Sequence, residues 1–398
     1  MRDTSYGTSA RKLSSKKTRP AQQKQGGPQK GPIVIAVGSI DYTALLAIMM
    51  LVLIGVVMVF SASYHRAMNT TAFNYNMFHF FTRQGLFAVM GFCVMMLTAS
   101  IHYRTWLRFT WHLYLASIVL LGYVAIFSEE VMGARRWMAL PLIGSFQPSE
   151  LAKIAVIFAT SYIIYRNKNL LKNWAGFLFC CALVGVLAVF VLFGSFSAAI
   201  IISLIGFGII FIASPHVMRF VVGGVAMVGG VVSILMFGQG FRSARFEAWL
   251  DPFSFPDTFG FQTIQSLYAI GSGGIFGLGL GQSRQKSFLP EPFNDFIFAI
   301  IAEELGLVGA GLVLFLFAFL IWRGIKIAMN ATDTFGSLLA GGIVLMVATQ
   351  VIINVGVTTN TIPNTGVSMP FISYGGTALV TTMFLMGVLL NISRYSKE

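Results

Sequence analysis

The sequence predicts an all-α polytopic membrane protein with ten transmembrane helices and a large extracellular loop between helices 7 and 8. Three observations lead to this fold class. The 398 residues are 56% hydrophobic and only 10% charged, whereas soluble domains carry about 25% charged residues. Hydrophobic runs near the length that crosses a bilayer as a helix recur along the whole chain. Lys and Arg concentrate in alternate connections between these runs.

The chain divides into a tail and a membrane domain. Residues 1–38 are rich in Lys, Gln, Ser, Gly and Pro and lack apolar periodicity, so we expect a disordered basic cytoplasmic tail. This basic region is too long for a signal peptide. Residues 39–398 are expected to form the ten-helix domain, with the large loop at 238–294. The expected spans are 42–63, 79–98, 106–127, 148–165, 174–193, 196–213, 217–237, 295–322, 336–357 and 371–392.

The net charge of +13 reflects membrane topology rather than nucleic-acid binding. Of 27 Lys and Arg residues, 18 fall on the side of the expected bundle that holds both termini, and seven fall on the other. The positive-inside rule therefore predicts a plasma-membrane protein with both termini in the cytoplasm and the 238–294 loop outside. Cations kept outside against this rule invite a functional explanation. They are Arg66, Arg135, Arg136, Arg242, Arg245, Arg284 and Lys286.

The cysteines do not form a framework. Cys93, Cys180 and Cys181 all lie in hydrophobic runs, and we interpret them as buried small residues. No compact metal-ligand motif is visible, so no residue is assigned to a metal. A divalent cation such as Mg²⁺ is carried only as a hypothesis, and no other cofactor is expected.

The 238–294 loop is expected to carry the chemistry, because charges, glycines and prolines crowd there between two hydrophobic spans. It is also too long for a plain helix–helix connection. Six glycines between Gly271 and Gly281 would allow close backbone approach to a ligand or re-entry into the membrane. No strand precedes this run and no GK[ST] ending follows, so it is neither a Rossmann nor a Walker motif.

Glu150 and Lys153 are three residues apart at the start of the expected fourth span and so share one helix face. Pro148, just before them, suits a first helical turn. An ion pair entering a membrane is costly and normally faces a bundle interior or a water-filled cavity. Two interpretations remain open: a structural pair that fixes helix packing, or one wall of a polar substrate groove.

Asp295 precedes the apolar run FIFAII and is expected at the outer boundary of the membrane. Partial desolvation there would raise its pKa and suit it to act as a base. Taken alone, this residue is more simply interpreted as a helix N-cap, where Asp is favoured. Glu303 and Glu304 lie deeper on the same span and must be buried against partners, for which Arg83 is a candidate.

The last outer loop, NTIPNTGVSMPFISYGG at 360–376, carries no charge. Its hydroxyl and amide side chains, Ser373 among them, would either line a sugar path or serve as turn and helix-packing residues. The sequence favours neither interpretation.

Taken together and in order, these motifs resemble the SEDS family, which contains FtsW, RodA and sporulation relatives. The resemblance runs from about residue 40 to the end, and two segments, GLGQSRQK and FQTIQSL, are closer to FtsW and the sporulation relatives than to RodA. The motifs are FSASY at 60–64, GARRW at 133–137, FQPSELAK at 146–153, QSLYAIGSGG at 265–274, GLGQSRQK at 279–286, LPEPFNDFIFAIIAEELG at 289–306 and PFISYGG at 370–376.

The resemblance implies a peptidoglycan glycosyltransferase that polymerises lipid II, an undecaprenyl-pyrophosphate-linked precursor, during cell division or wall growth. It also implies a class B penicillin-binding protein and other divisome proteins as partners. The family's catalytic aspartate matches Asp295. The expected substrate-binding residues are Arg136, Glu150, Lys153, Arg242, Arg245, Gln265, Ser266, Lys286 and Ser373.

Two positions depart from the family pattern. Phe293 and Asn294 stand where the family usually has a His-Thr pair before the aspartate. Ser195 stands where an acidic residue usually begins the sixth span, which leaves open the part of that span in catalysis or packing. A specialised paralogue would fit these departures.

The expected chemistry fits the residue types. A pyrophosphate leaves without a proton, so chain growth needs one carboxylate base together with positive charge near the phosphates. A lipid II flippase is the alternative function, but it would need polar residues through the full bilayer depth, and the expected cytoplasmic half is poor in buried charge. A pure scaffold for division proteins would leave Asp295 and the outer cations unexplained.

Overall fold

The computed structural model describes residues 38–128, 136–140, 144–221, 223–224, 247–258 and 260–396. Nine of the ten expected spans are long helices within these residues. The seventh expected span, 217–237, and residues 1–37 of the expected tail lie largely or wholly outside them. The long helices are α1 (Tyr42–Asn69), α2 (His79–Ser100), α3 (Thr110–Phe127), α4 (Pro148–Arg166), α5 (Trp174–Leu192), α6 (Phe196–Ala213), α10 (Ile297–Asn330), α11 (Thr334–Thr358) and α12 (Gly376–Arg394).

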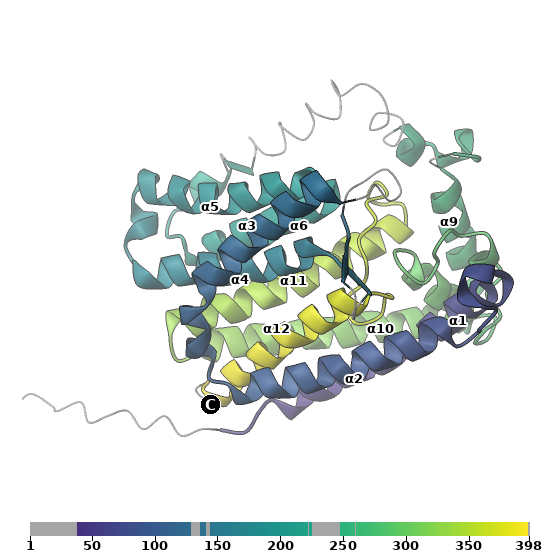
Figure 1. Ribbon diagram of the computed structural model, residues 1–398, viewed down its shortest axis with the longest axis horizontal. Helices are drawn as coiled ribbons and strands as arrows, with labels where there is room; N and C mark the ends of the chain where they lie inside the picture. Colours follow the sequence, from purple (N-terminus) through teal and green to yellow (C-terminus); the bar gives the residue numbers. More distant parts are fainter. Residues whose placement is uncertain are drawn as a thin grey trace, which may run out of the picture. The chain divides into compact units, whose positions relative to one another are not determined.

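The helices pack into a bundle with α11 and α4 in its interior. Helix α11 contacts α10, α6, α4 and α12, and α4 contacts α3, α5, α6, α11 and α12. Helices α1 and α2 lie on the opposite side of α12 from α3 and α5 (Figure 1). Apart from α4, all these helices are long and apolar enough to cross a membrane. Because α4 is almost entirely buried, it tolerates charges that lipid would not.

The two ends of the membrane domain meet at one end of the bundle. The Gly38 N–H donates to the Arg394 carbonyl at 2.9 Å, and the Asp41 N–H donates to Ser393 Oγ at 3.0 Å. Arg323 forms an ion pair with Asp41 at 2.6 Å, which ties α10 to the N-cap of α1. The first and last described helices therefore have their outer termini on the same side of the bundle.

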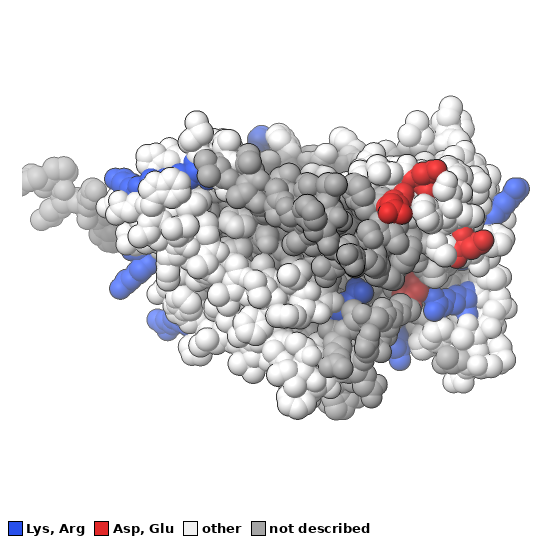
Figure 2. All heavy atoms as spheres, turned by 90° about the horizontal axis from the view of Figure 1, so that it is seen from above, with Lys and Arg blue, Asp and Glu red and all other residues white. Residues whose placement is uncertain are grey.

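The opposite end carries one shorter helix, two short strands and most of the described acidic side chains. Helix α9 (Phe261–Gly273) lies at this end (Figure 1). On the face shown in Figure 2, the visible acidic side chains lie toward this end, whereas the other end shows only Lys and Arg. Two short antiparallel strands, β1 (Met138–Leu140) and β2 (Gly144–Phe146), precede α4, with Ala139 opposite Ser145. The sequence analysis did not predict these strands, which are only three residues long each.

Helix α10 is broken at Gly306, whose φ of 67° interrupts its helical conformation. The glycine-rich segment fills the break: the Leu278 N–H donates to the Glu303 carbonyl at 2.9 Å, and the Leu307 N–H donates to the Gly274 carbonyl at 2.9 Å. A Cβ on Gly277 would lie 2.2 Å from the Glu304 carbonyl oxygen, so only glycine allows this approach. The span expected at 295–322 is therefore not one continuous helix, and a neighbouring segment satisfies the backbone groups that the break frees.

Candidate functional site

The backbone around Asp295 is fixed by three successive hydrogen bonds. The Tyr374 N–H donates to the Phe293 carbonyl at 2.9 Å, and the Ser373 hydroxyl donates to the Asn294 carbonyl at 2.7 Å. The Asn354 amide donates to the Asp295 carbonyl at 2.8 Å and to the Val367 carbonyl at 2.7 Å. Helix α11 and the last outer loop therefore hold Asp295 in place by its backbone.

The Asp295 carboxylate itself is left free. It is half-buried and has no hydrogen-bond partner among the described residues. Its Oδ2 would lie 3.2 Å from a Cβ on Gly366, a residue with φ of 63°, so glycine keeps the adjacent loop close without a side chain. The N-cap interpretation is wrong, because the N-cap of α10 is Phe296 and no side chain caps the helix.

The surroundings of Asp295 raise its pKa to about 6. Burial is the main cause, the neighbouring Glu291 carboxylate adds to it, and the Arg136 guanidinium opposes it. A carboxyl with this pKa is still mostly ionised at neutral pH and is a stronger base than an ordinary aspartate. General bases work best when their pKa lies near the operating pH.

The residues that depart from the family pattern have structural partners here. The Asn294 amide donates to Glu291 Oε2 at 2.7 Å, and Arg66 lies 3.6 Å from Glu291 Oε1. The Phe293 ring lies under the Arg66 guanidinium and packs against Phe80. Glu291, which Arg66 contacts, thus borders the aspartate.

The second departure also has a local role. Ser195 is the N-cap of α6, and its hydroxyl accepts from the Ala198 N–H at 3.3 Å. A serine satisfies this helix end without adding charge.

Glu150 and Lys153 form the ion pair expected from their spacing, with 2.8 Å between Nζ and Oε2. Both side chains are almost completely buried, at 7% and 3% exposure for the residues. Thr381 of α12 donates to the same Glu150 oxygen at 3.4 Å. The pair therefore lies inside the bundle, in the first turn of α4; its role toward a substrate stays a prediction.

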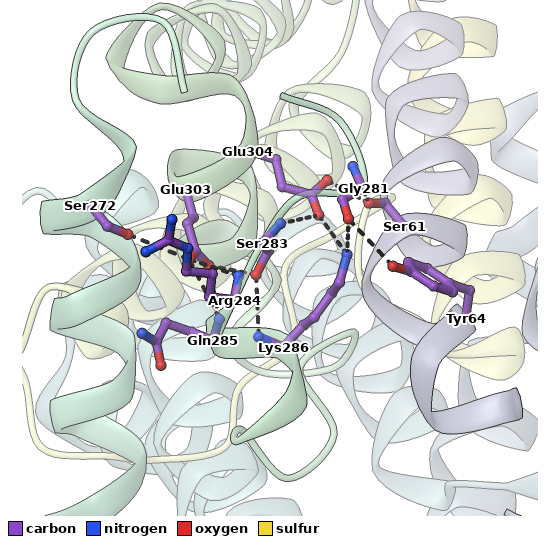
Figure 3. A network of polar contacts seen from close by, with 10 residues as sticks. All are labelled: Ser61, Tyr64, Ser272, Gly281, Ser283, Arg284, Gln285, Lys286, Glu303 and Glu304. Atoms are coloured by element: carbon purple, nitrogen blue, oxygen red, sulfur yellow. Dashed lines mark hydrogen bonds and ion pairs between the residues drawn. The ribbon is translucent and has the colours of Figure 1, made fainter. Parts of the chain in front are cut away.

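Glu304 is the centre of a buried network that joins α1, α10 and the loop before α10 (Figure 3). The ammonium group of Lys286 lies 3.2 Å from Oε1, and the Ser61 hydroxyl donates to Oε2 at 2.5 Å. Lys286 also donates to the Gly281 carbonyl at 2.6 Å and lies over the Tyr64 ring. The charge of Lys286 is thus engaged within the protein, and its predicted contact with substrate remains a prediction.

Glu303 is satisfied by the same loop (Figure 3). The Ser283 hydroxyl donates to Oε2 at 2.5 Å, the Arg284 N–H donates to Oε1 at 3.0 Å, and Ser272 of α9 donates to Oε1 at 3.4 Å. The partners of Glu303 and Glu304 are therefore residues of this loop together with Ser61 and Ser272, and the expectation that Arg83 pairs with one of them is wrong. Arg83 instead lies beside Tyr374.

The other predicted site residues are distributed as follows. Ser266 is buried on α9, and its hydroxyl donates to the Thr358 carbonyl at 2.8 Å, which attaches α9 to α11. Gln265 is half-buried beside it. Arg242 and Arg245 lie outside the described residues. In the described ranges, no three His, Cys, Asp or Glu residues are grouped as a metal site would require.

Asn354 was missed as a site residue by sequence reasoning. It is fully buried in the apolar helix α11. An amide within a membrane span was the available signal, because polar residues there are costly and normally have a partner. Its partner, the Asp295 carbonyl, lies 59 residues away along the chain.

Fold and site define a multi-pass helical membrane protein with a carboxylate held free at one end of its bundle. The chain belongs to the FtsW/RodA/SpoVE family of cell cycle proteins, whose sequence profile matches residues 42–398. This membership confirms the resemblance found in the motifs.

Relatives match over nearly their full lengths. Stage V sporulation protein E of Bacillus subtilis is 40% identical over 373 residues, which cover 90% of this chain and 98% of that protein. A probable peptidoglycan glycosyltransferase FtsW of Geobacter sulfurreducens is 38% identical over 358 residues, which cover 89% and 95%.

Solved structures share the fold. One solved structure is described as "Structural coordination of polymerization and crosslinking by a peptidoglycan synthase complex". A chain of that structure superposes on this protein with a TM-score of 0.75 at 24% identity, and the match covers 89% of this chain and 98% of that one. The rod shape determining protein RodA of Thermus thermophilus has a TM-score of 0.65 at 23% identity, covering 90% and 98%. These likenesses confirm the polytopic all-α fold class.

Proposed function

We propose that this protein is a peptidoglycan glycosyltransferase that polymerises lipid II, with Asp295 as the general base. The observation that carries the proposal is the Asp295 carboxylate: its backbone is clamped by α11 and the last outer loop, its side chain is free, and its pKa is raised to about 6. The names of the relatives support the reaction class.

The step requires one base. Asp295 takes the proton from a sugar hydroxyl as its oxygen attacks the anomeric carbon of the second substrate. The new C–O bond forms while the bond to the lipid pyrophosphate breaks, and the pyrophosphate leaves with the electron pair. Arg136, whose charge already acts on Asp295, would stabilise the departing phosphates. Attack opposite the leaving group inverts the anomeric carbon.

The flippase alternative is less well supported. The buried ion pairs within the described helices, Glu150–Lys153 and Lys286–Glu304, lie in the first turn of α4 and about 10 Å from the start of α10. Both helices start at the end of the bundle that carries α9. A carrier of a charged headgroup would favour buried charged pairs across the whole depth, whereas polar residues buried elsewhere, such as Ser161, Gln350 and Asn391, are uncharged.

The test is polymerisation of lipid II by the purified full-length protein, with and without a co-purified class B penicillin-binding protein as the expected partner. Wild type should form glycan chains, and Asp295→Asn should not. Normal polymerisation by Asp295→Asn would contradict the assignment of the base. Lipid II flipping by wild type without any polymerisation would favour the alternative function.

We also propose that the α9 end of the bundle faces outward and both termini face the cytoplasm, from the cation asymmetry. Ser287 and Asn169 are exposed near opposite ends, so each is suited to a single labelled cysteine. The exposed Cys93 must first be replaced by serine. In intact cells an impermeant thiol reagent should label Ser287→Cys and not Asn169→Cys; the reverse pattern would overturn the topology.

A further inference from the structure

A pocket lies beside the first turn of α4, between α3, α5 and the start of α6. Its polar lining includes Arg136, Ser149 and Ser195, and its apolar wall includes Leu121, Val124 and Phe190. No acidic residue of the described chain lines it. The acid next in sequence, Glu150, is already neutralised by Lys153 at 2.8 Å.

Two helix N-termini open onto this pocket. Helix α4 has 19 residues and begins at Pro148, with no side-chain cap from Gln147. Helix α6 has 18 residues and begins after Ser195. Each N-terminus carries partial positive charge, and N–H groups there bind anions. Together with the Arg136 guanidinium, whose charge also acts on Asp295, they give the pocket a positive potential, and no carboxylate of the described chain lines it.

Ser149 supplies a second, independent indication of a ligand. It lines the pocket and is 6% exposed, and its hydroxyl is buried without a hydrogen-bond partner. An unpaired buried hydroxyl costs stability, and Ser149 differs from the other unpaired hydroxyls of α4, those of Thr160 and Ser161, because it lines the pocket. A bound acceptor such as a phosphate oxygen would satisfy it.

We propose that this pocket is the subsite for the pyrophosphate of a polyprenyl-linked substrate, with the first part of the hydrocarbon chain against its apolar wall. The inference rests on the proposed function and adds Ser149 and the two helix N-termini to it. Arg136 connects the two sites, because it lines the pocket and its charge acts on Asp295. The pyrophosphate would therefore leave from the side of Asp295 on which Arg136 lies.

Binding, rather than activity, tests the pocket. The probe is undecaprenyl pyrophosphate, titrated against the purified full-length protein in detergent and compared with undecaprenol and with inorganic pyrophosphate. Ser149→Ala removes one hydrogen bond to a charged group and should weaken binding about tenfold. Ser149→Asp puts a negative charge at the phosphate position and should weaken binding at least ~100-fold. Because Ser149 is buried, the thermal stability of both variants is measured alongside binding, and the Ser149→Ala comparison decides if Ser149→Asp does not fold.

The matched control is Ser161→Ala, which removes another buried, unpaired hydroxyl of α4 that does not line the pocket. It should bind like wild type. Wild-type affinity in both Ser149 variants would overturn the proposal. Equal affinity for undecaprenol would refute the anion subsite, and equal affinity for inorganic pyrophosphate would refute the lipid chain.

The proposal and the function can fail separately. If wild type polymerises lipid II and Ser149 does not affect probe binding, the subsite is wrong and the enzyme assignment stands. If wild type binds the probe in a Ser149-dependent way but makes no glycan, the subsite stands and the proposed reaction falls.

Discussion

Asp295 and Glu304 are both carboxylates near the same end of the bundle, yet their surroundings are opposite. Glu304 is fully buried and receives donors from Lys286, Ser61 and the Ser283 N–H. Asp295 is held only by its backbone carbonyl, and no donor among the described residues meets its carboxylate oxygens. A satisfied buried charge fixes structure, whereas a free, partly desolvated one is available for chemistry.

The largest expected difference between the two acids is in catalysis. Asp295→Asn keeps the shape of the side chain and removes the base, so lipid II polymerisation should fall by about 10²–10⁴-fold. The wild-type carboxylate accepts no hydrogen bond from the described residues, so the substitution breaks none of them. The amount of protein in the membrane and its thermal stability should therefore be retained. A variant that loses both folding and activity would show that Asp295 is structural.

The converse change tests Glu304 through its partner. Lys286→Met leaves a buried negative charge and should destabilise the detergent-solubilised protein by about 3–5 kcal/mol. The double variant Lys286→Met/Glu304→Gln should recover part of this loss, because no lone charge remains. Chemical denaturation of the two single variants and the double variant measures the coupling.

The exposed Arg284, in the same loop, provides a matched control. Arg284→Met should change stability by no more than about 0.5 kcal/mol. Strict additivity of the Lys286 and Glu304 changes would show that the ion pair does not stabilise the fold.

Glu150 and Lys153 allow the same cycle inside α4. Lys153→Met or Glu150→Gln alone should cost more stability than both together, since a lone buried charge is the expensive state. If polymerisation is lost in the double variant while thermal stability recovers, the pair contacts substrate. Full recovery of both would make it a packing feature only.

The smallest effect concerns pH. The folded pKa of Asp295 is raised from 3.8 to about 6, so its ionisation costs stability above about pH 6, and this cost disappears below about pH 4. Asp295→Asn should therefore be slightly more stable than wild type at pH 7.5, with the difference closing between pH 6 and pH 4. In wild type, kcat/KM should fall as pH drops through about 6.

A stability difference between wild type and Asp295→Asn that does not change with pH would contradict this linkage. Lys286→Met is the comparison variant, because its loss of stability comes from an ion pair and not from the desolvation of Asp295.

The sequence by itself determined the membrane class and nine of the described helices, and it named Asp295 as the candidate base. The spans follow from a local property, the length of each apolar run. The Glu150–Lys153 ion pair likewise follows from their i, i+3 spacing on one helix. The same local reasoning failed at α10, because periodicity does not reveal that Gly306 interrupts a helix whose apolar pattern continues.

Only the tertiary structure decided which residues surround the acids. Ser61 hydrogen-bonds Glu304, which lies 243 residues away along the chain, and Asn354 hydrogen-bonds the Asp295 carbonyl, which lies 59 residues away. The alternatives left open for Asp295 could not be separated by composition, because an N-cap and a free base use the same residue type at the same helix end. The structure excludes the N-cap, because Phe296 stands at the cap, and it leaves the Asp295 carboxylate without a donor among the described residues.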